Sequence, residues 1–227
     1  MRSDTTFCPS FGNRPHELIG RENVVQALVD GLKTWPGNRE RAIVILGQRG
    51  SCKTVLLWEL ADRARELGFV VANPTTATEG MLDRIIEKIQ RDGERYIPLK
   101  HAKVSGGSIG ALGFSAGLQF TRETLETKSF HYKLSMLCEK LGVQGHGVLI
   151  LIDEIHANSP DIRQLVASYQ ELVGERSDIA IVMAGLPAAV SGTLNDHVLT
   201  FLNRARRVEL GPISLPAIRA YFAHAFH

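Results

Sequence analysis

The residues best suited to chemistry stand in one segment, Gly47-Gln48-Arg49-Gly50-Ser51-Cys52-Lys53-Thr54. It follows the apolar run Ala42–Leu46 and leads into Val55-Leu56-Leu57, an order typical of strand, glycine turn and helix. A bound polyphosphate needs inward-facing backbone N–H groups, a helix N-terminus, a cation for its terminal phosphates and a hydroxyl for magnesium. Lys53 and Thr54 supply the last two, so the pattern predicts a loop that binds a nucleoside triphosphate with Mg²⁺. We expect the contacts to come from Gly47, Gln48, Arg49, Gly50, Ser51, Cys52, Lys53, Thr54 and Val55.

One residue departs from the usual form of such a loop, the Walker A pattern, in which glycine precedes the lysine. Here that position holds Cys52, which adds a Cβ and a sulfur where the backbone passes close to a phosphate. The chain can bind nucleotide through this altered loop, or the segment can be a glycine turn that only joins a core strand to a helix. A second motif favours nucleotide binding.

That second motif is an acidic pair, Asp153-Glu154, which directly follows the apolar run Val148–Ile152. Carboxylates at the C-terminal tip of a buried parallel strand project into the crevice where ligands of open α/β sheets bind. Asp153 can hold the Mg²⁺ shell through water, and Glu154 can act as general base on the attacking water. The two motifs together predict a site for ATP and Mg²⁺.

Composition constrains the partners and the compartment only loosely. The chain has 227 residues, with 26 Lys and Arg against 24 Asp and Glu, a balance that neither demands nor excludes nucleic acid. Its three cysteines, Cys8, Cys52 and Cys138, form no Cys-x-x-Cys pair, which argues against a disulfide framework or zinc site and favours a cytoplasmic location. The longest apolar stretches are only strand-length, so we expect no membrane span. Residues 1–15 contain many polar and turn-forming residues and no apolar run like that of a secretory signal, so we expect a loose N-terminal arm.

Short apolar runs alternate with longer amphipathic ones, a pattern typical of a mostly parallel sheet with helices on both faces. The predicted strands cover residues 42–46, 69–72, 148–152, 179–184 and 208–210. The predicted helices cover residues 22–34, 54–67, 80–90, 123–141, 159–173, 188–203 and 214–226. Residues 96–120 interrupt this rhythm with five glycines among apolar residues, which predicts an inserted loop or irregular β-hairpin.

With these motifs the chain resembles the AAA+ ATPases, and more narrowly the origin-recognition-type and STAND-like ATPase domains of many bacterial proteins. Leu18-Ile19-Gly20-Arg21-Glu22 is similar to the box that lines the adenine pocket in that group, which implies that Gly20 and Arg21 border the base. The order of phosphate loop, Asp153-Glu154 and the strand 179–184 is similar to that of Walker A, Walker B and the sensor-1 strand.

The resemblance implies a fold and a division of the chain. The fold is a three-layer α/β P-loop NTPase with an AAA+ core, whose five parallel strands, numbered along the chain, stand in the order 5-1-4-3-2. A nucleotide-binding domain then covers residues 16–211, with 96–120 as an insertion. Residues 212–227 correspond to the first helix of a lid that is otherwise largely absent.

Two further features bear on hydrolysis. The resemblance implies an arginine finger among Arg204, Arg206 and Arg207, with Arg204 the first choice; a cation there can equally offset the dipole of a helix C-terminus. The sensor-1 strand ends Met183-Ala184-Gly185 without the polar side chain that family members often carry, so we expect slow turnover.

The motifs and the resemblance predict an ATP-driven molecular switch, an ATPase with Glu154, Lys53 and Arg204 as catalytic residues and with Mg²⁺ on Thr54 and Asp153. The resemblance implies a homo-oligomer or a protein partner, in DNA-associated assembly or in STAND-type signalling, although no DNA-binding module can be identified. The alternative is a non-hydrolysing nucleotide-binding module for protein interactions, with a degenerate P-loop. A small-molecule phosphotransferase fits the order of the motifs less well.

Overall fold

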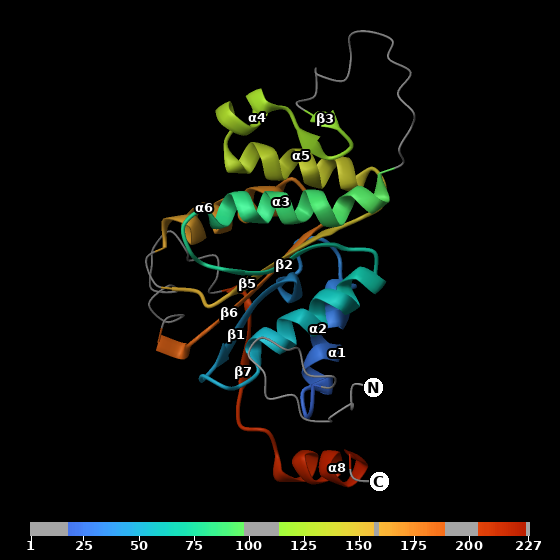
Figure 1. The fold of residues 1–227 in the computed structure, drawn as a ribbon, viewed down its shortest axis with the longest axis vertical. Coiled ribbons are helices and arrows are strands. Elements are labelled where there is room, and N and C mark those ends of the chain that lie inside the picture. Colours follow the sequence, from blue (N-terminus) through green and yellow to red (C-terminus); the bar gives the residue numbers. More distant parts are fainter. Residues whose placement is uncertain (1–17, 98–113, 157–158, 189–203, 226–227) are drawn as a thin grey trace, which may run out of the picture.

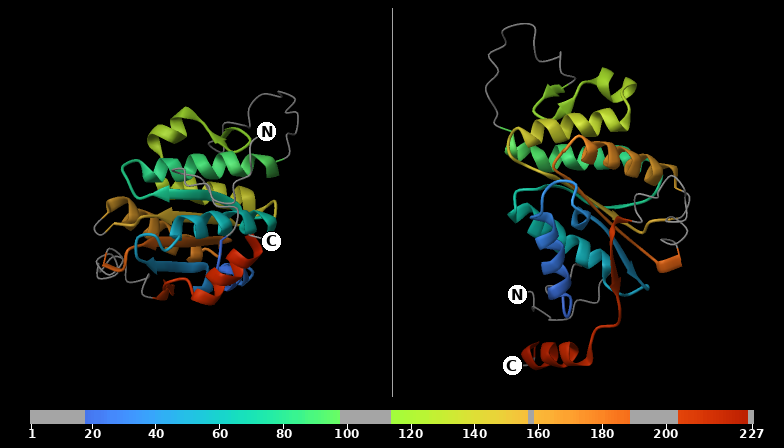
Figure 2. Two further views of the ribbon diagram at one scale, coloured as in Figure 1. Left: turned by 60° about the horizontal axis from the view of Figure 1, so that its bottom comes forward. Right: turned by 180° about the vertical axis from the view of Figure 1, so that it is seen from behind.

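The computed structural model describes residues 18–97, 114–156, 159–188 and 204–225. A sheet of five strands lies between two layers of helices (Figure 1). Helices α1 and α2 cover one face of the sheet, and α3, α5 and α6 cover the other, as the view from behind also shows (Figure 2). This is the predicted three-layer α/β arrangement.

The sheet has the order β2-β5-β6-β1-β7, and each neighbouring pair in it is parallel. Its strands are β1 (Ala42–Gly47), β2 (Val70–Thr76), β5 (Val148–Asp153), β6 (Ile179–Gly185) and β7 (Arg206–Leu210). The predicted order 5-1-4-3-2 is therefore confirmed. The observed β2 runs four residues beyond its predicted end at Ala72, across a register shift between Ala72 and Thr75 where Lys88 Nζ donates to Asn73 O and to Thr75 Oγ1.

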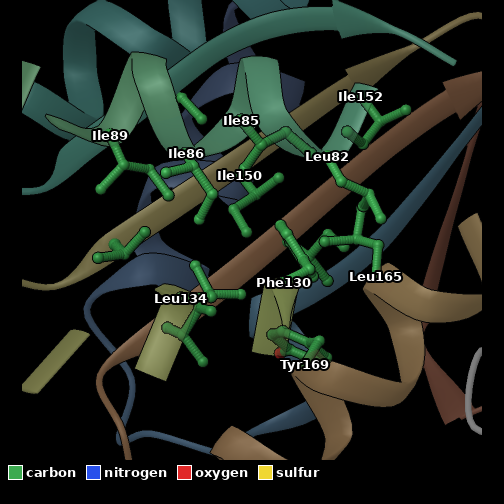
Figure 3. Close-up of a cluster of buried hydrophobic side chains, with 14 of the residues drawn as sticks. Leu82, Ile85, Ile86, Ile89, Phe130, Leu134, Ile150, Ile152, Leu165 and Tyr169 are labelled. Atoms are coloured by element: carbon green, nitrogen blue, oxygen red, sulfur yellow. The ribbon is translucent and has the colours of Figure 1, made fainter. Parts of the chain in front are cut away.

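Two hydrophobic clusters hold the layers together, and strand β5 contributes to both because alternate residues face opposite sides of a sheet. Val148, Ile150 and Ile152 belong to the cluster with α3, α5 and α6, whereas Leu149 and Leu151 belong to the cluster with α1 and α2. All five side chains are fully buried. Figure 3 shows Ile150 and Ile152 among Leu82, Ile85, Ile86, Ile89 and Tyr169.

Apart from α5, the helices on the two faces begin and end within about three residues of their predicted bounds. They are α1 (Glu22–Leu32), α2 (Lys53–Glu66), α3 (Met81–Gly93), α5 (Phe130–Gly142) and α6 (Pro160–Gly174). Short 3₁₀ turns at Arg39–Arg41 and Glu94–Tyr96 precede β1 and follow α3, and α8 (Leu215–Ala225) follows β7. No helix in the described ranges is both long and apolar enough to cross a membrane.

The single helix predicted over 123–141 is wrong, because the chain forms two helices there. Helix α4 (Arg122–Thr127) ends at Lys128, whose backbone is extended, with φ −96° and ψ 145°. Ser129 then begins α5 by accepting a hydrogen bond from the Tyr132 N–H through its side chain. A serine in this position is a strong helix start, and the amphipathic pattern alone did not separate it from a helix interior.

Part of the predicted insertion forms an irregular β-hairpin, one of the two alternatives that the sequence left open, and this hairpin packs into the core. Strands β3 (Phe114–Ala116) and β4 (Gln119–Phe120) form an antiparallel hairpin, in which the rings of Phe114 and Phe120 stack at 4.7 Å. Leu118 in the turn is fully buried, and its carbonyl accepts from Gln90 of α3. Residues 98–113, the predicted arm 1–15 and nearly all of the predicted helix 188–203 lie outside the described residues.

Candidate functional site

The phosphate loop lies between β1, an interior strand of the sheet, and the first residue of α2, which is Lys53. The Lys53 ammonium donates to the carbonyls of Gly47 (2.8 Å) and Gln48 (2.9 Å), at the opposite end of the loop. The side chain of Lys53 thus links the last part of the loop to its first two residues. Gln48, Arg49 and Gly50 are exposed at its tip, and Val55 is half-buried one turn into the helix.

Two features of this loop are those of a cradle for an anion. The Ser51 Oγ is buried and has no hydrogen-bond partner within the described part of the chain. A Cβ on Gly47 would collide with this hydroxyl, so only glycine leaves room for it at that position. An orphaned buried hydroxyl beside a glycine at the N-terminus of a helix fits a ligand rich in oxygen atoms.

Cys52 adopts a left-handed backbone conformation, with φ 64° and ψ 27°. A residue with a Cβ is strained there, whereas glycine is not. The Cys52 Sγ lies 3.7 Å from the carbonyl oxygen of Gly50, a weak contact that does little to offset this strain. Cysteine in place of the usual Walker A glycine therefore also raises the conformational energy of the backbone at this position.

The phosphate loop and the end of β5 meet through one hydrogen bond. Thr54 Oγ1 donates to Asp153 Oδ2 at 2.5 Å, although the two residues are 99 positions apart in the sequence. The other oxygen of this carboxylate accepts the backbone N–H of Glu154 at 3.0 Å. Asp153 is 8% exposed, and Glu154 is exposed. The fold thus brings together Lys53, Thr54, Asp153 and Glu154, as the two motifs predict.

The Gly20-Arg21 box lies against the segment that follows β7. A Cβ on Gly20 would come within 3.0 Å of Ile213 and 3.2 Å of Ala217, and the Arg21 guanidinium donates to the carbonyl of Gly211. Arg21 is only 7% exposed, and its Nε has no partner among the described residues. The box therefore contacts the start of α8, and its role at the adenine stays a prediction.

The three arginines before the last strand differ in their surroundings. Arg206 lies within β7 and donates to Glu40 Oε2 at 2.5 Å and to the Ala27 carbonyl at 3.5 Å, so it fastens β7 to the α1 side of the domain. Arg204 is exposed in a turn before the strand, and Arg207 is exposed on the strand. Arg206 is held in an ion pair with Glu40, while the finger role of Arg204 stays a prediction.

One residue that sequence reasoning missed lies next to the acidic pair. Ile155 is only 2% exposed and packs in the cluster with α3, α5 and α6, while its N–H donates to the carbonyl of Ala184 at 3.0 Å. This bond ties the end of β5 to the sensor-1 strand, which has no polar side chain at its tip. The signal in the sequence is that an apolar residue, Ile155, directly follows two acidic residues, where a solvent-exposed loop would be expected to continue with polar residues.

In this parallel sheet, β1 leads into a glycine loop that carries a lysine, and a carboxylate at the end of β5 accepts a hydrogen bond from the hydroxyl that follows the lysine. These features define a P-loop nucleotide-binding domain. The family model for the AAA ATPase domain matches residues 17–182, and the chain belongs to this family. The predicted family and fold are thereby confirmed. A comparison with curated proteins gives no significant match.

Solved structures of ORC and DnaA proteins are similar to this chain. ORC2 of Aeropyrum pernix, in ADPNP–ADP complexes, matches with a TM-score of 0.60 and 14% identity over 95% of this chain and 54% of that chain. Aeropyrum pernix ORC1 in complex with DNA matches at 0.47 and 18% (93% and 50% covered), and AMPPCP-bound DnaA from Aquifex aeolicus at 0.46 and 14% (85% and 46%). The chain thus spans about half the length of these proteins. The ORC2 likeness supports the fold alone.

Proposed function

We propose that this chain is an ATP-driven molecular switch that binds ATP with Mg²⁺ at residues 47–55 and hydrolyses it at the end of β5. The observation that carries the proposal is the hydrogen bond between Thr54 and Asp153, because it joins the hydroxyl of the phosphate loop to the carboxylate of the second motif. Membership of the AAA ATPase domain family supports nucleotide binding.

The residues at this contact fit magnesium. Mg²⁺ bound with a nucleotide takes one or two oxygens from the protein and completes its shell with phosphates and water. Thr54 and Asp153 offer two adjoining oxygens, and the described residues contain no group of three or more His, Cys, Asp or Glu side chains that would hold a metal alone. When bound, the ion would neutralise charge on the β- and γ-phosphates.

Each residue of the proposed site has a defined role in binding or hydrolysis. Lys53 turns its ammonium from the two loop carbonyls to the terminal phosphates, and the loop N–H groups surround the anion. Glu154 lies beside Asp153 and accepts the proton of the attacking water. Gly20 and Arg21 border the base, and Arg204 reaches a neighbouring copy or a partner protein.

A first experiment tests binding. Calorimetry with Mg-ATP is run on the wild type, Lys53→Ala and, as a control on a surface lysine, Lys33→Ala. The Lys53 variant should bind at least tenfold more weakly, because it loses charge-assisted hydrogen bonds worth roughly 1.5–3 kcal/mol. Binding that survives in Lys53→Ala would refute the proposed site.

A second experiment tests hydrolysis. Glu154→Gln should lower kcat by about a hundredfold or more, since general-base catalysis contributes roughly 10²–10⁴ in rate, while the Kd for Mg-ATP changes little. Glu175→Gln, at an exposed glutamate after α6, serves as the matched control. Turnover that is unaffected by Glu154→Gln would show that another group is the base.

The second candidate is a nucleotide-binding interaction module that does not hydrolyse ATP. Two observations favour it: the strained backbone at Cys52 and the absence of a polar side chain at the tip of β6. Tight Mg-ATP binding by the wild type with no turnover above that of Glu154→Gln would support this candidate over the switch.

A further inference from the structure

Glu154, the proposed general base, stands in an unfavourable backbone conformation. Its φ is 54°, and in the described ranges only Cys52 and Arg176 share a positive φ without being glycine. Such a conformation costs an L-residue free energy, and it persists only where the surrounding structure imposes it. The structure must therefore contain contacts that hold Glu154 in place.

The periodicity of β5 shows what the turn at Glu154 changes. Even-numbered residues from Val148 to Ile152 face the cluster with α3, α5 and α6, and odd-numbered ones face α1 and α2. If the strand simply continued, Glu154 would face the first cluster and Ile155 would face the side of α2, where Thr54 lies. Instead, Ile155 lies in the first cluster and Glu154 is exposed. The left-handed residue reverses the alternation.

Two contacts fix this reversal, one on each side of Glu154. Before it, the Asp153 carboxylate accepts the Glu154 N–H at 3.0 Å while also accepting from Thr54. After it, Ile155 is 2% exposed and donates its N–H to the Ala184 carbonyl at 3.0 Å. Burial of the Ile155 side chain thus stabilises the left-handed backbone conformation at Glu154.

We infer that Ile155 is a positioning residue for hydrolysis: its burial and its bond to the sensor-1 strand hold Glu154 in the left-handed conformation that keeps the carboxylate out of the core and beside Asp153. This inference rests on the proposed function of Glu154. The inference also assigns a role to the tip of β6, which has no polar side chain: the backbone carbonyl of Ala184 accepts the Ile155 N–H and so helps to position Glu154.

The kinetic test compares three variants in the full chain. Ile155→Ala should lower kcat at least tenfold and leave the Kd for Mg-ATP within threefold, because Lys53 and Thr54 stay in place. Ile155→Val keeps most of the buried side chain and should restore kcat to within threefold of the wild type. Ile89→Ala empties a fully buried position on α3 in the same cluster and should leave kcat unchanged.

Three kinetic outcomes overturn the inference. They are an unchanged kcat in Ile155→Ala, an equal loss of kcat in Ile89→Ala, and a loss of ATP affinity in Ile155→Ala that matches its loss of kcat. The last two would mean that a softer core, rather than the position of Glu154, lowers the rate.

A stability measurement separates this inference from the proposed function. Glu154→Gly relieves the strain and should raise the equilibrium constant for folding by about threefold in urea titrations, with a smaller gain in the Ile155→Ala background. If the wild type shows no turnover, the proposed hydrolysis fails, and this pair of titrations still decides whether Ile155 imposes the strain. If Glu154→Gly brings no gain, or the same gain in both backgrounds, the inference is wrong.

Discussion

Replacing Cys52 by glycine should make the protein more stable and bind Mg-ATP more tightly. Cys52 has φ 64° and ψ 27°, a conformation that glycine adopts without strain and that a residue with a Cβ does not. Its side chain gives little in return, since the Sγ lies 3.7 Å from the Gly50 carbonyl. The substitution also removes atoms from a loop whose backbone must approach a phosphate closely.

The size of the effect follows from two opposing terms. Left-handed geometry costs an L-residue roughly 1–2 kcal/mol. Glycine gives back roughly 0.4–1 kcal/mol, because it adds conformational freedom to the unfolded chain. The free energy of unfolding should therefore rise by about 0.5–1 kcal/mol, which raises Tm by about 1–4 °C for a chain of this size.

Two variants serve as controls in urea and thermal unfolding. Cys52→Ala removes the sulfur but keeps the Cβ, so it should bring no comparable gain in stability. Arg176→Gly relieves a similar strain, with φ 62°, at an exposed residue between α6 and β6, and it should raise stability without changing Mg-ATP binding. Calorimetry on the same proteins then measures the affinity.

The results can refute the reasoning in two ways. A Cys52→Gly protein that is no more stable than the wild type, or a Cys52→Ala protein that gains as much, would show that backbone strain is not the cause. If only Cys52→Gly binds Mg-ATP, the native loop is degenerate, and the function lies in protein contacts.

Two further predictions concern the cysteines and the arginines. Iodoacetamide should label Cys52, which is half-buried, and spare Cys138, because burial raises the pKa of the Cys138 thiol to about 12; mass spectrometry that finds equal labelling would contradict this. Arg206→Ala should lower the free energy of unfolding by about 1 kcal/mol at neutral pH, whereas Arg204→Ala should not. Burial raises the pKa of the Glu40 carboxyl, but hydrogen bonds, that from Arg206 first, outweigh it and hold this pKa below its ordinary value. The difference in free energy of unfolding between the wild type and Arg206→Ala should then be largest at pH values above the ordinary pKa of a glutamate. It should disappear as the pH falls through the lowered pKa of Glu40, and a difference that persists in acid would mean that the ion pair is not its source.

The layers could be predicted because strands that are buried on both faces appear in the sequence as continuous apolar runs, whereas the strand order was implied only by the resemblance to the AAA+ ATPases. Residues 148–152 are apolar throughout, which is typical of an interior strand of a parallel sheet that is buried on both faces. The boundary between α4 and α5 was missed for the opposite reason: its local signal is one hydrogen bond that the Ser129 side chain accepts from the Tyr132 N–H, and a serine occurs in helix interiors as well. The hairpin at Phe114–Phe120 was one of two predicted alternatives, but its place in the core depends on contacts with α3 and α5 that are distant in the sequence.

In the site, residue types were predictable and backbone conformations were not. Lys53, Thr54, Asp153 and Glu154 are recognised by type and order, because phosphate and magnesium need those groups. That Glu154 turns left-handed depends on Ile155 and on the carbonyl of Ala184 in another strand, which no local pattern encodes.

The strain at Cys52 and at Glu154 lies on the two sides of the Thr54–Asp153 hydrogen bond. A protein selected for stability alone would place glycine at both positions, since each change removes strain. At Cys52 glycine would restore the usual phosphate loop, so there stability and nucleotide binding improve together. At Glu154 glycine would remove the proposed base, so there stability and turnover oppose each other. The two substitutions therefore distinguish a strained residue that the proposed chemistry requires from one that it does not.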